Sequence, residues 1–304
     1  MRAEEPSFAV WLEAFKAEAR ARGVSAATLE RAFSGVRPLL AVLEADRRQP
    51  ERRLRFTEYL ERVVNEARIR RGRELAAVHR PLLERVRMRF GVPAPIVVAL
   101  WGIESSYGTR TGEYRVIDAL ATLAWEGRRA ELFRKELFAA LEILERGERE
   151  PHQLLGSWAG AMGQCQFLPS SYLAHAIDFD GDGRRDIWTS LPDVFGSIGQ
   201  YLARAGWWPG ERWGRAVRPS KAIDPALDGL ERRLPLSEWS HRGIRALDGG
   251  PLPALELEAS LLRPEGESGP AFLVYRNFRT LMAWNRSTYF ALSVGLLADR
   301  LAEA

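Results

Sequence analysis

The 304-residue sequence contains a single cysteine, Cys165, so no disulfide bond can form within the chain. A lone cysteine also excludes a metal site built from several thiolates, and it is compatible with either an oxidising or a reducing compartment. The sequence has no run of about 18 consecutive apolar residues, which is the length that a membrane-spanning helix needs. Low-complexity tracts are absent, and 46% hydrophobic and 28% charged residues are typical of a folded globular protein.

The N-terminal residues lack an apolar segment, and the basic residues of the chain include few lysines. Residues 1–6 lack the apolar segment of a signal peptide, so we expect either that the protein acts in the cytoplasm or that an export signal has been replaced or removed. Only three of the 44 basic residues are lysines, and the net charge is +4. This balance favours an acidic partner such as nucleic acid, anionic lipid or an anionic polymer. However, acidic residues are interspersed along most of the chain, and the densest basic run, residues 68–73, is typical of one exposed helix face.

Most of the chain has helical periodicity. Apolar residues recur at helical spacing from Phe8 to Phe90, which predicts several helices. A second helical stretch opens at Val92–Pro95, because proline is tolerated in a first helical turn. It is apolar nearly all round as far as Ile103, which predicts a buried helix. Breaks are expected at Gly23, Gly35, Pro38 and Pro50, and further helices at residues 118–125, 130–146, 170–177, 194–205 and 287–301.

The pattern changes after about Trp207, where prolines and glycines become frequent and helical periodicity fades. The short alternating runs Leu255–Glu258 and Phe272–Tyr275 predict strands. We therefore expect residues 211–275 to form a small, mostly β insertion in a mainly helical chain.

Glu104 stands at the end of the apolar helix, directly before Ser105-Ser106-Tyr107-Gly108. A carboxylate is costly to bury in its charged form among apolar residues, so its pKa is expected to rise, which suits a general acid near neutral pH. The alternative is an ordinary helix-end glutamate that is capped by the backbone or points to water.

Residues 156–172 form a segment rich in glycine and aromatic residues. Three closely spaced glycines allow the backbone to approach a ligand, and Ser157 and Gln166 supply the hydroxyl and amide groups that sugars bind. The alternative is a tight connection between two helices with Ser170 as an N-cap.

Residues 178–186 match positions one, three, five, six and nine of an EF-hand calcium loop. The acidic positions are held by Asp178, Asp180, Asp182 and Asp186, and Arg184 stands at position seven, where the backbone carbonyl is the ligand. Position twelve departs from the pattern, because Thr189 replaces the bidentate glutamate; Asp193 could close a longer loop. A solvated acidic turn without metal is the alternative.

Together these segments resemble the lytic murein transglycosylase B family, glycoside hydrolase family 103. The matching segments are Trp101–Gly108, Ser157–Tyr172, Asp178–Trp188, Gly206–Trp208, Asn277–Phe278 and Trp284–Ser287, and Gln49–Glu51 is similar too. The resemblance implies a mainly α (α+β) fold with a lysozyme-like helical core. The expected domains are a helical domain at 1–90, a catalytic core at 91–210 with the EF-hand-like loop at 178–193, a small antiparallel β domain at 211–275, and a C-terminal helix at 276–304 that returns to the core or helical domain.

The resemblance also implies the roles of individual residues. Glu104 matches the catalytic acid and base. Trp284 and Phe290 stand where the family often has tyrosines, and they retain an aromatic wall. The implied substrate-binding residues are Ser157, Met162, Gln166, Tyr172, Trp284, Asn285 and Phe290, and the implied ligands of a structural calcium ion are Asp178, Asp180, Asp182, Arg184 and Asp193. Catalysis itself is expected to need no cofactor.

The implied reaction cleaves the MurNAc-β-1,4-GlcNAc bond without water. Glu104 protonates the departing oxygen while the substrate's own N-acetyl oxygen attacks the anomeric carbon, and Glu104 then takes the C6 hydroxyl proton to give a 1,6-anhydro end. A two-carboxylate glycosidase would need a second acid about 5 to 9.5 Å away. Glu113 and Asp118 are near in sequence, but each is more simply a surface or capping residue.

Three alternatives to this lyase stay open at the level of sequence. One is a hydrolytic muramidase of the same fold, the second is a non-catalytic peptidoglycan-binding scaffold, and the third, a nucleic-acid binder, is suggested by charge alone. With the transglycosylase, the expected partners are peptidoglycan glycan strands and no nucleic acid, with cell-wall synthesis proteins left open. A monomer in the periplasm is expected, the location being inferred from the implied substrate.

Overall fold

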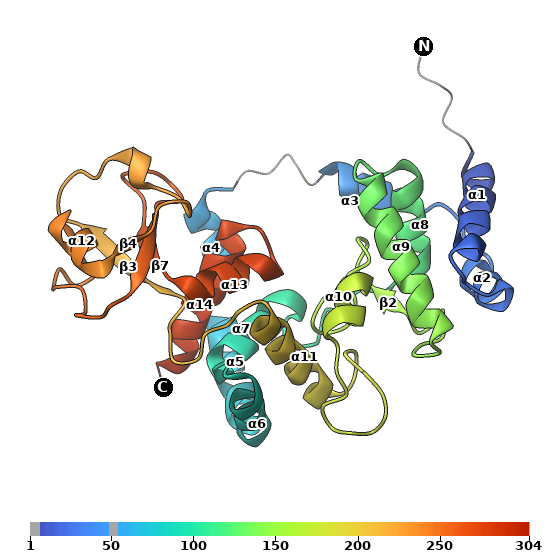
Figure 1. Cartoon of the computed structure of the whole chain (residues 1–304), viewed down its shortest axis with the longest axis horizontal. Helices are drawn as coiled ribbons and strands as arrows, with labels where there is room; N and C mark the ends of the chain where they lie inside the picture. Colours follow the sequence, from blue (N-terminus) through green and yellow to red (C-terminus); the bar gives the residue numbers. More distant parts are fainter. Residues whose placement is uncertain (1–6, 49–53, 304) are drawn as a thin grey trace, which may run out of the picture. The chain divides into compact units, whose positions relative to one another are not determined.

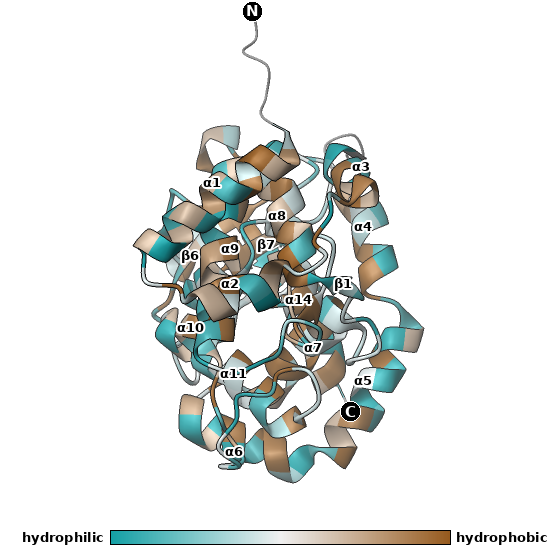
Figure 2. Ribbon diagram, turned by 90° about the vertical axis from the view of Figure 1, so that its right-hand side faces the viewer, coloured by the Kyte–Doolittle hydropathy of each residue, from teal (hydrophilic) through white to brown (hydrophobic). Residues whose placement is uncertain are grey.

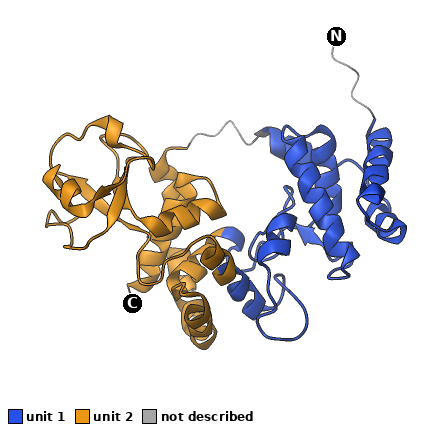
Figure 3. Cartoon of the chain, viewed as in Figure 1, with its two compact units in different colours: residues 1–53, 104–198 blue, residues 54–103, 199–304 orange. Residues whose placement is uncertain are grey.

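The computed structural model describes residues 7–48 and 54–303, so the similarity expected at Gln49–Glu51 and the break expected at Pro50 lie outside the described residues. The chain forms two compact units, each built from two separate stretches of sequence (Figure 3). Unit 1 comprises residues 1–53 and 104–198, and unit 2 comprises residues 54–103 and 199–304. The four expected domains follow the chain consecutively whereas these units are discontinuous, and the domain boundaries stay a prediction.

Unit 1 is built mainly of helices. Its hairpin of α8 and α9 carries the core, because Val116 to Ala124 of α8 are buried with the exception of Asp118. Ser7 and Ser25 cap α1 and α2, since each side chain accepts a backbone N–H of the following first turn. The elements are α1 (Phe8–Ala21), α2 (Ala26–Phe33), α3 (Leu40–Arg48), β1 (Tyr114–Arg115), α8 (Val116–Glu126), α9 (Ala130–Glu145), β2 (Leu155–Gly156) and α10 (Pro169–His175) (Figure 1).

Unit 2 combines helices with one antiparallel sheet, whose strand order is β4-β6-β7-β3-β5. Its core under the sheet contains Trp239, Leu261 and Leu273, which have no exposed surface. The helices are α4 (Phe56–Val63), α5 (Glu66–Val78), α6 (Arg80–Phe90), η1 (Pro225–Leu227), α12 (Leu236–His241), α13 (Arg276–Trp284) and α14 (Thr288–Ala302), and the strands are β3 (Gly214–Pro219), β4 (Leu234–Pro235), β5 (Ile244–Ala246), β6 (Glu258–Leu262) and β7 (Ala271–Val274).

Two helices, α7 (Ala94–Ser105) and α11 (Leu191–Arg204), contain two of the three positions where the chain passes from one unit to the other. The side chains of α7 are buried from Ile96 to Trp101, as its apolar sequence predicts. The helix before it, α6, ends at Gly91, whose φ of +70° favours glycine. A Cβ at Gly91 would lie 2.5 Å from Cγ of Pro209, so the close packing of this turn also requires glycine.

The mainly α fold class with a small antiparallel sheet is confirmed. Surface helices such as α1 and α5 alternate hydrophobic and hydrophilic residues in Figure 2, which is the pattern that made them recognisable. Among residues 7–48 and 54–303, no single helix is long and apolar enough to cross a membrane, although α6 and α7 together, bent by 110° at their junction, pass the same test of length and composition.

The sequence interpretation was wrong in parts of the region 211–301. The run Leu255–Glu258 is not a strand before Glu258, because the N–H groups of Leu255 and Leu257 each donate to a carbonyl two residues earlier and so turn the chain. The second predicted strand is displaced by one residue, to Ala271–Val274. The helix α12 was not predicted. The C-terminal helix expected at 276–304 is divided into two helices, α13 and α14, by residues 285–287.

Candidate active site

Glu104 lies in the last turn of α7 and is half-buried. The following residue, Ser105, is fully buried, and its hydroxyl oxygen accepts the N–H of Gly108 at 3.0 Å. Its carbonyl accepts the N–H of Arg110 at 2.8 Å. The chain that leaves the helix after Glu104 is therefore held by Ser105 in a compact turn.

Backbone strain is concentrated around this turn. In the part of the chain that the structure describes, the residues other than glycine with positive φ are Ser106 (+50°), Tyr107 (+60°) and Gln166 (+51°). Such a conformation costs of order 1–3 kcal/mol per residue and persists only where the surroundings enforce it, which is common at active sites. The strained residues mark two segments, the turn at 104–112 and the glycine-rich segment at 156–167.

These two segments, both in unit 1, are packed backbone against backbone. A Cβ at Gly112 would lie 2.1 Å from the carbonyl carbon of Gly156 and 2.4 Å from the amide nitrogen of Ser157, so this contact requires glycine. The Gln166 amide group donates to the carbonyl of Thr111 at 3.0 Å. The short strands β1 and β2 pair just beyond this contact. Glu104, Ser157 and Gln166 are thus carried by two segments that are fixed to each other.

Ser157 organises the glycine-rich segment. Its hydroxyl oxygen accepts the N–H groups of Ala159 at 3.3 Å and Ala161 at 3.1 Å, and its own N–H donates to the carbonyl of Ala161 at 2.7 Å. Since a hydroxyl has one proton to donate, Ser157 can still donate a hydrogen bond to a ligand. Gln166 can instead accept a hydrogen bond from a ligand. Its amide group donates to the carbonyls of Thr111 and Gly163, and this leaves Oε1 as the atom suited to accept.

Cys165, the cysteine of the glycine-rich segment, lies close enough to Glu104 for the charge of that carboxylate to affect the pKa of its thiol. Cys165 is fully buried, and its thiol donates to the carbonyl of Val194 at 3.4 Å. Burial raises the pKa of the Cys165 thiol well above its usual value, and the negative charges of Glu104 and Asp193 raise it further. The thiol is therefore protonated and unreactive, and the carboxylate of Glu104 lies within electrostatic range of the glycine-rich segment.

Two of the expected substrate-binding residues, Met162 and Tyr172, have no exposed side-chain surface. Met162 pairs with Gly156 and Phe167 across the segment. The Tyr172 hydroxyl lies 2.8 Å from both Glu148 Oε2 and the carbonyl of Arg185, and burial followed by the Glu148 carboxylate raises its pKa. Both side chains support the loop in this structure, and their contact with a substrate stays a prediction.

The remaining predicted substrate-binding residues, Trp284, Asn285 and Phe290, belong to unit 2, around the junction of α13 and α14. Trp284 packs on Tyr201 with ring centroids 4.7 Å apart. Asn285 is exposed, and its Oδ1 accepts the N–H of Ser287 at 3.0 Å, whereas Phe290 is 6% exposed. Their part in the site stays a prediction.

Two other carboxylates, those of Glu113 and Asp118, are near Glu104 in the sequence, and their surroundings differ from each other. Glu113 is exposed. Asp118 lies in the first turn of α8 beside Arg115 at 3.5 Å, and burial raises its pKa although the arginine lowers it. Glu113 is therefore a surface residue as the sequence suggested, whereas the side chain of Asp118 does not cap α8 and its buried Oδ1 accepts no hydrogen bond from any described residue.

The sequence did not reveal Glu136, a carboxylate of α9 that is 3% exposed. It accepts the N–H of Ser170 at 2.9 Å and its hydroxyl at 2.7 Å. The expectation that Ser170 is an N-cap was therefore wrong, since α10 begins at Pro169 and Ser170 bonds to another helix. The only sign of Glu136 in the sequence is that an acidic residue stands on the inward face of an amphipathic helix. The strain at Ser106 and Tyr107 has no such signal, because neither residue type favours positive φ.

The aspartate-rich segment forms a loop with its carboxylates together. Ligand oxygens of Asp178, Asp180 and Asp182 all lie within 4.8 Å of one another. Gly181 and Gly183 adopt positive φ and donate their N–H groups to Asp178 at 2.6 and 2.8 Å. Burial raises the pKa of Asp178, but hydrogen bonds from Gly183, Gly181 and Asp182 outweigh it and the net effect is a lowered pKa. Three carboxylate groups at this spacing fit a calcium ion.

Asp193, which was expected to close the loop as a metal ligand, accepts hydrogen bonds from the loop backbone in this structure. It is fully buried, its Oδ1 accepts the N–H of Phe179 and its Oδ2 that of Asp186, each at 2.7 Å. Asp186 in turn accepts the N–H groups of Trp188 and Thr189. Asp193 thus fixes the loop backbone, and its role and that of Arg184 as metal ligands stay predictions.

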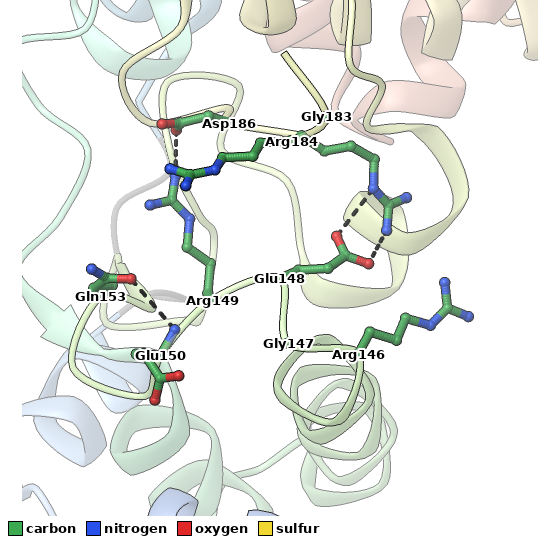
Figure 4. Close-up of a pocket in the computed structure, with 10 residues that line it drawn as sticks. Arg146, Gly147, Glu148, Arg149, Glu150, Gln153, Gly183, Arg184 and Asp186 are labelled. Carbon is green, nitrogen blue, oxygen red and sulfur yellow. Dashed lines mark hydrogen bonds and ion pairs between the residues drawn. The ribbon is translucent and has the colours of Figure 1, made fainter. Parts of the chain in front are cut away.

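A cavity of about 710 Å³ lies on the other side of this loop, between residues 146–153 and 183–186 (Figure 4). It is lined by ion pairs, Arg149 with Asp186 and Arg185 with Glu148. The guanidinium of Arg149 also stacks on Trp188, 4.3 Å from the ring centroid. The charges that line this cavity are largely neutralised, and we interpret it as the scaffold that positions the loop.

Comparison with known proteins shows similarity in sequence along most of the chain. A family model described as a transglycosylase SLT domain matches residues 7–299. Membrane-bound lytic murein transglycosylase B of Escherichia coli is 35% identical over 224 residues, which are 73% of this chain. The match spans 60% of that curated relative's own length.

Solved structures extend the similarity to three dimensions. SltB3 of Pseudomonas aeruginosa, in complex with NAG-anhNAM-pentapeptide, is 47% identical with a TM-score of 0.94, and the match covers 98% of this chain and 80% of SltB3. The Escherichia coli lytic transglycosylase Slt35 in complex with calcium is 29% identical with a TM-score of 0.80, covering 99% and 94% of the two chains. From the family model, which spans nearly every described residue, the chain belongs to the transglycosylase SLT domain family.

Proposed function

We propose that this protein is a lytic transglycosylase that cleaves the glycan strand of peptidoglycan between MurNAc and GlcNAc and leaves 1,6-anhydroMurNAc ends. The observation that carries the proposal is the position of Glu104, at the end of a buried helix and at the start of a strained turn that is fixed to the glycine-rich segment. That segment supplies a donor, Ser157, and an acceptor, Gln166. The SltB3 complexes with NAG-anhNAM-pentapeptide and NAG-NAM-pentapeptide support the choice of substrate.

In the proposed reaction Glu104 acts first as an acid and then as a base. It protonates the leaving GlcNAc oxygen while the N-acetyl oxygen of MurNAc bonds to the anomeric carbon. It then removes the proton of the C6 hydroxyl, whose oxygen bonds to the anomeric carbon and displaces the N-acetyl oxygen. The half-buried position of Glu104 favours both steps, because it limits the access of water that would otherwise give a hydrolysed product.

Ser157 and Gln166 are proposed to orient the sugar. The Ser157 hydroxyl has a proton to donate, and Gln166 Oε1 can accept a substrate N–H or O–H. Their segment is fixed to that of Glu104 through Gly112 and Thr111, so the three side chains keep their spacing as a group. Trp284, Asn285 and Phe290, which belong to unit 2, are also proposed to bind the glycan strand.

A structural calcium ion is proposed in the aspartate-rich loop. Asp178, Asp180 and Asp182 would be its carboxylate ligands and Arg184 a carbonyl ligand, and the calcium complex of Slt35 supports this choice. The ion would neutralise three neighbouring carboxylates and has no part in the reaction. A periplasmic location and glycan strands as the partner follow from the proposed substrate.

The test of the catalytic assignment is Glu104→Gln with Glu113→Gln as the matched control, because Glu113 is an exposed glutamate of the same unit. We expect Glu104→Gln to keep its circular dichroism spectrum and glycan binding but to lose about 100-fold or more in turnover of purified peptidoglycan. Glu113→Gln should retain turnover. Retention of most activity by Glu104→Gln would overturn the assignment.

A further inference from the structure

A second charged cavity, of about 490 Å³, lies in unit 2 against the neighbouring strands β6 and β7 of the sheet. Its floor comes from β6 and β7, one wall from the first turns of α13, and the rim from the loop before β6. Three guanidinium groups line it, from Arg233, Arg276 and Arg279, together with three carboxylates, from Glu211, Glu256 and Glu258.

These six charged side chains do not neutralise one another. Among the described residues, none of the six takes part in an ion pair, although each lines the same cavity. Arg276 and Arg279 are one helical turn apart and so share a face of α13. The cavity therefore offers separate positive and negative groups to a ligand, unlike the neutralised ion pairs of the cavity in unit 1.

Arg279 is the most constrained of the three arginines. It is half-buried, and its Nη2 donates to two neutral acceptors, the carbonyl of Leu230 at 2.6 Å and the hydroxyl of Ser260 at 3.0 Å. Burial lowers the pKa of its guanidinium, and the like charge of Arg233 lowers it further, while Glu231 raises it. Two arginines that repel each other without a carboxylate partner would both be stabilised by a bound anion.

The neighbouring surface supplies an apolar platform. A second hollow, of about 540 Å³, shares Glu211, Glu256 and Tyr275 with the first. It is lined by Trp208, which is 53% exposed, and by Leu255, which is 52% exposed. Arg276 lies 4.5 Å from the ring centroid of Trp208 and connects the two hollows.

From this combination we propose that the two hollows form a binding site for a short peptide that carries both carboxylate and ammonium groups. Arg233 and Arg279 bind the C-terminal carboxylate of the peptide, Glu256 and Glu258 face an ammonium group, and Trp208 with Leu255 covers the aliphatic part. The peptide stem of peptidoglycan has this chemistry, so the site would hold the stem while the glycan is cleaved elsewhere; this identity of the peptide rests on the proposed function, whereas the site itself does not.

Binding of an isolated peptide tests the site without any turnover. The probes are a peptidoglycan stem pentapeptide with its free C-terminal carboxylate and the same peptide as its C-terminal amide, titrated into the full chain by calorimetry. We expect the amide to bind about tenfold more weakly, because it lacks the charge-assisted bonds to the arginines. Equal affinity for acid and amide, or no binding of either, would contradict the proposal.

The matched variants are Arg233→Gln, which removes an exposed arginine of the cavity, and Arg218→Gln, which removes an exposed arginine of β3 outside it. Arg233→Gln should weaken binding of the acid about tenfold and leave binding of the amide unchanged, and Arg218→Gln should change neither. Arg279→Gln is a second variant, with a thermal melt to check folding, because Arg279 also bonds to Leu230 and Ser260.

Turnover separates this proposal from the proposed function. On glycan that bears stems, Arg233→Gln should raise KM with kcat unchanged, and on stem-free glycan it should change neither value. An equal effect on both glycans would overturn a stem-binding role. If the wild type cleaves neither glycan, the proposed function fails, and the peptide titration still decides whether the site exists.

Discussion

At the scale of single residues, the candidate site depends on close backbone contact as much as on the carboxylate. Glu104 and Cys165 were both visible in the sequence, but their electrostatic proximity was not. The three strained residues, Ser106, Tyr107 and Gln166, could not be predicted, because strain depends on what the folded surroundings enforce. The roles of Ser157 and Gln166 came from resemblance, and the structure adds which of their atoms are used within the loop.

Gly112 is the residue at which this contact can be tested. Gly112→Ala would place a methyl group against the backbone of Gly156 at a φ of +89°, whereas Gly147→Ala, at a φ of +68°, meets no atom within 4 Å. We expect Gly147→Ala to cost about 1–2 kcal/mol in the free energy of unfolding, and Gly112→Ala about 1–3 kcal/mol more.

Urea unfolding of both variants measures the difference. Gly112→Ala should also lower kcat, because Ser157 is displaced relative to Glu104. Equal destabilisation by the two substitutions, with unchanged kcat, would show that the two segments are not held in the described contact.

At the scale of elements, helices with a clear apolar pattern or a cap were predictable, and short elements were not. The helix α7 was recognised from its proline-containing start and apolar sequence. The run Leu255–Glu258 misled because alternation alone does not provide a neighbouring strand, and its backbone turns instead. The EF-hand-like loop was predictable from spacing, whereas the hydrogen bonds that Asp193 accepts from the loop backbone depend on the position of α11, which begins at Leu191.

In α8, Asp118 gives a prediction about pH. Burial raises its pKa above the ordinary 3.8, with Arg115 opposing, so the folded protein binds this proton more tightly than the unfolded chain does. Its contribution to stability is therefore fully present below pH 3.8 and is lost as the pH rises through the folded-state pKa. Asp118→Asn should remove this loss of stability with rising pH.

Denaturant midpoints of the wild type and Asp118→Asn, measured from acid to neutral pH, provide the test. The variant should gain stability relative to the wild type as the pH rises. A constant difference across the range would mean that the pKa of Asp118 is the same in both states.

The aspartate-rich loop gives a prediction about metal. We expect calcium to bind the native loop and not the unfolded chain, so it should raise the Tm by mass action, and a chelator should reverse the shift. Asp180→Ala should abolish the shift, whereas Asp248→Ala, at an exposed turn outside the loop, should preserve it. An unchanged Tm of the wild type in calcium would show that the loop holds no ion.

At the scale of the whole molecule, the sequence predicted a mainly helical chain with a small antiparallel sheet, and this fold class is confirmed. The division into two discontinuous units could not be predicted, because it depends on long-range contacts and not on local composition. The predicted residues are divided between these units, with Glu104 in unit 1 and Trp284 in unit 2. Membership of the transglycosylase SLT domain family follows from the match over residues 7–299.

The central claim, a non-hydrolytic cleavage through Glu104, is tested most directly by the mass of the products. Purified peptidoglycan is digested with the wild type and with Glu104→Gln, and the released muropeptides are analysed by mass spectrometry. We predict products lighter by one water than their hydrolysed counterparts from the wild type, and none from the variant. Ordinary reducing ends from the wild type, or anhydro ends from Glu104→Gln at a comparable rate, would contradict the account.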